Sequence, residues 1–169
     1  MKLVIQRVTR AEVVVDGTTI SSIKHGIFAL VGIGRDETIE DMAWCTKRLT
    51  NMKLWPNEDG KPWKSSVSDI GGDILLVSQF TLHAKPSGSK LDFHRAGSNA
   101  EPVFNAFVDA VRSEYTPDKV CTGMFGAMMQ CSLVNDGPVT ITLDSRNRKN
   151  EDVAPVPAGS DRIDGEPTP

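Results

Sequence analysis

Apolar and polar residues alternate most regularly in segments 129–133 and 139–144, on either side of the sequence Asn135-Asp136-Gly137-Pro138. Alternation with a period of two is typical of half-buried strands. An Asp-Gly pair between such strands favours a two-residue hairpin, but Pro138 stands where the turn needs an amide hydrogen, which proline lacks. Two interpretations therefore remain open: an ordinary hairpin, or a special Gly-Pro geometry, because the cis and trans forms of an X-Pro bond differ by only ~0.5–1 kcal/mol.

Strands elsewhere in the chain are predicted from shorter patterns. The N-terminal alternation predicts a hairpin meander, and two continuous apolar runs predict strands that are buried on both faces. The meander covers residues 2–10, 12–17 and 20–23, and the apolar runs are 26–34 and 74–77.

Two helices are predicted by apolar residues that recur at helical spacing. The first runs from Thr38 to about Leu54, and Asp41 completes something close to a capping box. The second runs from Pro102 to Tyr115, with the proline in its first turn. Together with the strands, these helices indicate an α/β fold with mixed, mostly antiparallel sheets packed with two main helices.

Length and composition indicate one globular domain over residues 1–145, followed by a polar tail over residues 146–169. No apolar run approaches the ~20 residues that a membrane span needs, and the N-terminus does not read as a signal peptide. We therefore expect a cytoplasmic protein without a membrane partner. The three cysteines and three histidines lack metal-ligand spacing, so neither a metal nor another cofactor is expected.

The net charge is −3 and the sequence pI is about 5.6, which argues against binding of long nucleic acid by bulk electrostatics. This charge does not exclude a protein that grips only the end of an RNA. Local basic clusters are either solvated faces or phosphate contacts, and one of them consists of Lys85, Lys90 and Arg95.

The buried run 74–77 passes into Ser78-Gln79-Phe80-Thr81-Leu82, where polar side chains occupy both faces. This run and Asn135-Asp136-Gly137-Pro138-Val139-Thr140 resemble the paired signatures of the D-aminoacyl-tRNA deacylases, historically called D-tyrosyl-tRNA deacylases. The resemblance extends to Gln6-Arg7-Val8 and to segment 123–130, and covers about residues 1–145. It implies the deacylase fold, a homodimer, and hydrolysis of the ester between a D-amino acid and the 3′ end of tRNA.

The resemblance also implies a way of selecting handedness. In the family a cis Gly-Pro peptide reaches into the active site of the partner subunit, where its carbonyl oxygens accept from the substrate's α-ammonium and exclude an L side chain. Gly137 and Pro138 match that dipeptide, and Arg7 matches the side chain that holds it. Glycine has no side chain to exclude, so glycyl-tRNA mischarged on a non-cognate tRNA is expected to be a substrate too. The sequence alone does not show the isomer.

The reaction centre implied by the resemblance is lined by Ser78, Gln79, Phe80 and Thr81. No histidine is placed by sequence to activate Thr81 as a nucleophile, so the substrate's own 2′-hydroxyl is expected to assist catalysis, with backbone amides near Phe80 and Thr81 stabilising charge. Phe125 and Met129 match positions around the terminal adenosine, although as sequence alone they read as core residues.

Two alternatives remain open at this point. The first is a DNA-binding protein without deacylase activity, as suggested for eukaryotic relatives. The second is a paralogue that accepts an L-alanyl mischarged tRNA. Segment 84–98 departs from the bacterial pattern and is similar to eukaryotic members, so its contacts with RNA are not predicted.

Overall fold

The computed structural model describes residues 1–147 in full and the backbone of residues 148–150; most of the predicted tail, residues 151–169, lies outside the described residues. Eight strands, two α-helices and three short 3-10 helices follow one another within this part of the chain. Their order is β1 (Lys2–Val15), β2 (Thr18–Ile23), β3 (Gly26–Gly32), α1 (Ile39–Asn51), β4 (Asp73–Ser78), η1 (Phe80–His83), β5 (Lys85–Ser87), β6 (Lys90–Asp92), α2 (Ala100–Glu114), η2 (Pro117–Lys119), β7 (Val120–Thr122), β8 (Gln130–Asp144) and η3 (Ser145–Asn150).

The main sheet is mixed and is organised around β1. This strand pairs antiparallel with β2, β3 and β8, whereas β3, β4 and β7 pair in parallel. Strands β5 and β6 form a separate antiparallel hairpin. The predicted α/β class, with a mixed sheet and two main helices, is confirmed. The structure is of a single subunit. Within its described residues, β8 pairs only with β1.

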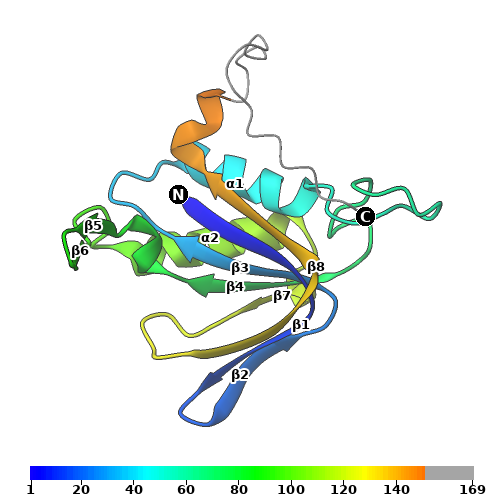
Figure 1. Ribbon diagram of the computed structural model, residues 1–169, viewed down its shortest axis with the longest axis horizontal. Helices are drawn as coiled ribbons and strands as arrows, with labels where there is room; N and C mark the ends of the chain where they lie inside the picture. The colour runs from blue at the N-terminus through cyan, green and yellow to red at the C-terminus, as the bar shows by residue number, and fades with distance from the viewer. Residues whose placement is uncertain (151–169) are drawn as a thin grey trace.

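The sheet curls, and its two faces bury separate cores. Figure 1 shows α1 and α2 on one side of the sheet and β2 swung below it on the other. Phe107 of α2 and Leu49 of α1 pack into the core on the helix side. Val13 and Phe28 belong to a second cluster inside the curl. The hydroxyl of Ser21 on β2 donates to a carbonyl of β7, so the two ends of the curled sheet are in contact.

Two predicted strand breaks are wrong. Segments 2–10 and 12–15 form the single strand β1, and residues 16–17 form the turn that follows it. The strand changes neighbours along its length: Val8 pairs with the start of β3, and Ala11 pairs with the end of β2. The exposed residues between them interrupt the alternation without ending the strand. Segments 129–133 and 139–144 likewise belong to one strand, β8, because both continue to pair with β1. The ordinary hairpin interpretation at Asp136-Gly137 is therefore excluded.

Both predicted helices are present within one or a few residues of the expected bounds. Thr38 caps α1, and the capping box with Asp41 is complete. Burial alone raises the pKa of the Asp41 carboxyl, but hydrogen bonds from Thr38 and Ser145 and the nearby N-terminal ammonium together lower that pKa below its usual value. Neither helix, nor any other in residues 1–150, is long and apolar enough to cross a membrane.

Candidate active site

A cavity of about 490 Å³ lies where β3 and β4 end and where the segment before β8 passes over them. The carboxyl ends of adjacent parallel strands leave such a crevice in many α/β proteins. Ala100, the first residue of α2, lines the same cavity. The cavity is lined by Val31, Ile33, Val77, Ser78, Gln79, Phe80, Ala100, Phe125, Gly126, Ala127, Met128, Met129 and Cys131.

The first motif leaves the sheet at the rim of this cavity. The amide of Gln79 donates to the carbonyl of Val31 at 2.8 Å, which is the last ladder bond before the chain turns into η1. Phe80 and Thr81 open that 3-10 helix, and the first amides of a helix have no acceptor within it. Thr81 is exposed, does not line the cavity, and accepts a hydrogen bond from the side-chain amide of Gln79. Three of the four predicted reaction-centre residues therefore line the cavity.

Phe125 and Met129 line the same cavity, and both also contact core residues. The ring of Phe125 lies 5.7 Å from that of Phe104, measured between centroids. A Cβ at Gly123 would lie 2.6 Å from the sulfur of Met129, so only glycine permits this approach. Each side chain is half-buried, so one part of it can pack in the core while another part faces the cavity. The two interpretations of these residues, as core residues and as base-contact residues, are therefore compatible.

The second motif forms a bulge in β8. Arg7 of β1 pairs with Val139 and Val8 pairs with Asn135, so residues 136–138 have no partner in β1. Gly137 has φ +121°, and the Gly137-Pro138 peptide bond is cis. Both residues of the dipeptide are exposed in the single chain.

Arg7 holds this bulge from inside the sheet. Its Nε lies 3.1 Å from the backbone oxygen of Asp136 and 3.1 Å from the carboxylate of the same residue, and its Nη1 donates to the carbonyl of Leu54. The Arg7 side chain is only 15% exposed. A guanidinium is planar and always charged, so three acceptors around it fix its orientation. The guanidinium therefore joins the bulge to the segment that follows α1.

A second pair of side chains lies beside the same bulge. The indole of Trp55 donates to Nε2 of His25 at 2.9 Å, and the two rings meet edge to face. Nε2 of His25 also lies 3.5 Å from the Asp136 carboxylate. Asp136 thus has Arg7 on one side and His25 on the other. Sequence analysis did not single out His25, Trp55 or Asp136, and only Asp136, which stands within the motif, had a signal that could have found it.

The bulge and the cavity lie apart within one chain. Arg7 pairs with Ile27 near the start of β3, whereas Val31, four residues further along β3, lines the cavity. At about 3.3 Å per residue this register separates them by roughly 13 Å along the strand. None of Arg7, Gly137 and Pro138 lines the cavity. The structure thus brings together three of the four predicted reaction-centre residues with the two predicted base-contact residues, and separately Arg7 with the dipeptide.

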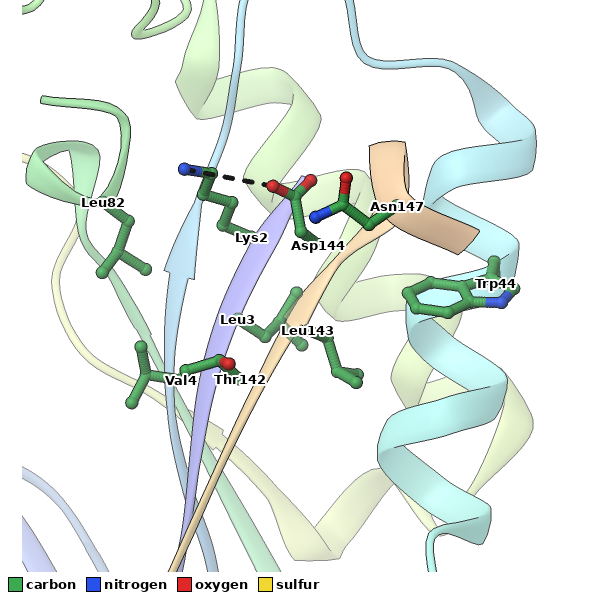
Figure 2. Close-up of a pocket in the computed structure, with 9 residues that line it drawn as sticks. All are labelled: Lys2, Leu3, Val4, Trp44, Leu82, Thr142, Leu143, Asp144 and Asn147. Carbon is green, nitrogen blue, oxygen red and sulfur yellow. Dashed lines mark ion pairs between the residues drawn. The ribbon is translucent and has the colours of Figure 1, made fainter. Parts of the chain in front are cut away.

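A different cavity, of about 390 Å³, lies beside the first residues of β1 and the last residues of β8. Figure 2 shows Trp44 of α1 on one side of it and Leu82 on the other, with the ion pair of Lys2 and Asp144 drawn between strand ends. None of the predicted site residues lines this cavity. We therefore place the candidate site at the cavity of the first motif.

One thiol lies in the candidate site. Cys131 lines the cavity, and desolvation raises the pKa of its thiol above the usual value. Among residues 1–150, no three His, Cys, Asp or Glu side chains are grouped so that they could hold a metal ion. All three cysteines are free.

Comparison with known proteins shows the family of the chain. The family model described as D-Tyr-tRNA(Tyr) deacylase matches residues 4–144. A D-aminoacyl-tRNA deacylase of Dictyostelium discoideum is 46% identical over 151 residues, which are 88% of this chain and 100% of that protein. The D-aminoacyl-tRNA deacylase of Saccharomyces cerevisiae is 46% identical over 148 residues, 86% of this chain and 99% of the yeast protein.

Two solved structures share the fold. One, titled c-Myc DNA Unwinding Element Binding Protein, is 44% identical with a TM-score of 0.82 over 85% of this chain and 98% of its own. The other, titled as a probable eukaryotic D-amino acid tRNA deacylase, is 16% identical with a TM-score of 0.73 over 84% of this chain and 97% of its own. The chain belongs to the D-Tyr-tRNA(Tyr) deacylase family and is therefore a hydrolase.

Proposed function

We propose that the protein hydrolyses the ester bond of D-aminoacyl-tRNA in the cytoplasm and thereby removes D-amino acids from tRNA before translation uses them. The motif residues that line the cavity, Ser78, Gln79 and Phe80, support this assignment together with family membership. The cavity is largely apolar except at the first motif, which suits an amino-acid side chain and an adenine base. An aminoacyl ester is already reactive, so recognition is the harder part of the task.

Handedness is selected in this proposal by the backbone of Gly137 and Pro138. D and L residues differ only in which position at Cα carries the side chain, so a rigid wall that forbids one placement discriminates between them. The exposed bulge held by Arg7, whose side chain is only partly exposed, is the observation that carries this proposal. Three acceptors fix the guanidinium, and the guanidinium in turn fixes the carbonyl of Asp136 next to the dipeptide.

The dipeptide acts on the neighbouring subunit of a homodimer. Within one chain it is roughly 13 Å or more from the cavity along the strand. Strand β8 has no partner on its outer edge within the described residues, and most of its side chains are exposed. An open edge strand of fifteen residues is a surface that proteins normally cover. A second copy of the chain that covers β8 would bring each dipeptide to the other's cavity.

Catalysis is assigned to the substrate and the backbone. The free amides that open η1 at Phe80 and Thr81 are suited to stabilise an oxyanion, and the 2′-hydroxyl of the terminal ribose assists the hydrolysis. Phe125 and Met129 contact the terminal adenosine. Thr81 contributes no nucleophile, since its hydroxyl is exposed and accepts from Gln79.

A comparative deacylation assay tests this function directly. We expect release of D-tyrosine from D-tyrosyl-tRNA, release of glycine from mischarged glycyl-tRNA, and no release from L-tyrosyl-tRNA. Equal cleavage of the D and L esters would reject the chiral wall. Cleavage of L-alanyl mischarged tRNA in preference to the D ester would instead assign the protein to the paralogous specificity.

Replacing Thr81 with alanine separates the two chemical routes. If the 2′-hydroxyl assists the reaction, the T81A variant should keep kcat for D-tyrosyl-tRNA within about threefold of the original chain, because the backbone amide remains. Single-turnover deacylation measures this rate. A complete loss of turnover with unchanged substrate binding would point to a side-chain nucleophile.

DNA binding is the second candidate function. The 44% identity and TM-score of 0.82 to the structure titled c-Myc DNA Unwinding Element Binding Protein favour it, whereas the net charge of −3 does not. Tight binding of duplex DNA by a chain that leaves D-tyrosyl-tRNA intact would support this alternative.

A further inference from the structure

The β5–β6 hairpin concentrates positive charge beside the candidate site. Lys85, Lys90 and Arg95 are exposed, and Asp92 is the one acidic side chain in segment 85–95. The Asp92 carboxylate accepts from the backbone amide and the ring of His94, and these two hydrogen bonds lower its pKa. The segment thus carries a formal charge of +2 in a chain whose net charge is −3.

The register of the hairpin places its lysines on one face. Lys85 pairs with Asp92 and Ser87 pairs with Lys90, so these four side chains point to the same side. The Pro86 and Leu91 pair faces the other way. Each strand is three residues, or about 10 Å, long. A stacked nucleic-acid strand carries a phosphate about every 3.4 Å along its axis, so the hairpin is long enough to face more than one.

An aromatic pair joins the hairpin to the cavity. The ring of Phe93 lies 5.2 Å from the ring of Phe80, which lines the cavity. Phe80 is 57% exposed and Phe93 is 38% exposed, so both side chains are accessible to a ligand although they contact each other. The return segment is fixed as well, because Gly97 donates to the carbonyl of Ile33, another cavity residue. In Figure 1 the hairpin and the loop between β7 and β8 project at the same end of the sheet.

We propose that this hairpin, formed by residues 85–92 with Phe93 and Arg95, binds the sugar-phosphate backbone of the single-stranded 3′ end of tRNA. Proteins that bind single strands combine a basic surface with exposed aromatic rings, and both lie here at the rim of one cavity. Bases stack on Phe80 and Phe93, and the cations neutralise the phosphates that precede the terminal adenosine. This inference rests on the proposed function, which places the aminoacyl ester in that cavity.

The test compares two substrates with one full-length variant. D-tyrosyl-tRNA carries the phosphates, whereas D-tyrosyl-adenosine carries the same ester without them. The triple variant K85A/K90A/R95A should lose at least about tenfold in kcat/KM toward the tRNA and stay within about twofold of the original chain toward the adenosine ester. The triple variant K47A/K61A/K64A removes the same charge from exposed positions away from the cavity and should leave both values unchanged.

Salt dependence gives an independent readout. Three phosphate contacts to a single strand correspond to about a 20-fold loss of affinity between about 50 and 200 mM salt, and the hairpin variant should lose most of this dependence. An equal fall in kcat/KM on both substrates, or no fall on the tRNA, would overturn the proposal. Weakened binding of duplex DNA with unchanged tRNA turnover would assign the hairpin to DNA and overturn it too.

Failure of the proposed function can be told apart from failure of the hairpin proposal. If the original chain hydrolyses neither ester, the deacylase assignment fails, and the hairpin is then judged by binding of uncharged tRNA alone. A tenfold weaker complex for K85A/K90A/R95A supports the hairpin contact, and an unchanged complex contradicts it.

Discussion

Replacing Arg7 with alanine is expected to lower kcat/KM for D-tyrosyl-tRNA by about 100-fold, equivalent to about 2.7 kcal/mol. Arg7 makes charge-assisted contacts with the backbone and carboxylate of Asp136 and with the carbonyl of Leu54. Hydrogen bonds to charged groups contribute about 1.5–3 kcal/mol each. Without them the bulge at 136–138 loses its fixed position. Steady-state deacylation of the D and L esters measures the loss, and we also expect discrimination between the two esters to fall.

Arg7→Lys is the matched control. Lysine keeps the charge but cannot reach three acceptors with a planar group, so an intermediate loss is expected. If the alanine variant retained both the rate and the preference for D esters, Arg7 would have no role in holding the selective dipeptide.

Gly137→Ala is the second change with a large expected effect. A Cβ at this position would lie 3.0 Å from the Cγ2 of Val139 and 3.1 Å from the Nη2 of Arg7, and the φ of +121° is one that residues with side chains rarely adopt. The dipeptide must therefore move. A shift of 1 Å at a recognition site can cost about 100-fold in rate, and a comparable loss of D-tyrosyl-tRNA deacylation is expected.

Gly17→Ala is the control for backbone strain. Gly17 has φ +77°, with nothing within 4 Å of the added Cβ, and it lies in the turn between β1 and β2. This variant should lose about 1–3 kcal/mol of stability, as Gly137→Ala does, while its deacylation rate stays unchanged. Thermal unfolding and deacylation measured on both variants separate the two effects. Equal activity of the two variants would contradict the role given to Gly137.

Much of the fold follows from local patterns, and the exceptions have identifiable causes. The helices were predictable because apolar spacing and the Thr38 capping box agree. The unbroken course of β1 was not, because its change of neighbour between Val8 and Ala11 depends on strands that are distant in sequence. The bulge in β8 was hidden for the same reason: Asp-Gly is a hairpin signal unless another strand, here β1, continues to pair on both sides of it.

The candidate site was predictable only in part. Ser78, Gln79 and Phe80 could be placed together because they follow a buried strand, whereas Phe125 and Met129 were placed with them by the family resemblance alone, since their own pattern is that of core residues. The position of Met129 depends on the glycine at position 123, which admits its sulfur. The position of His25 beside Asp136 has no sequence signal, because it depends on Trp55, which donates to His25 only in the folded chain.

The measurement that tests the central claim most directly is complementation between two inactive chains. Gly137→Ala damages the dipeptide but leaves the cavity intact, and Ala127→Trp fills the cavity but leaves the dipeptide intact. If one subunit's dipeptide completes the other's cavity, refolding an equal mixture should restore about a quarter of the original D-tyrosyl-tRNA deacylation, because half of the dimers then carry one complete site. A mixture no more active than the mean of its two parents would contradict the account.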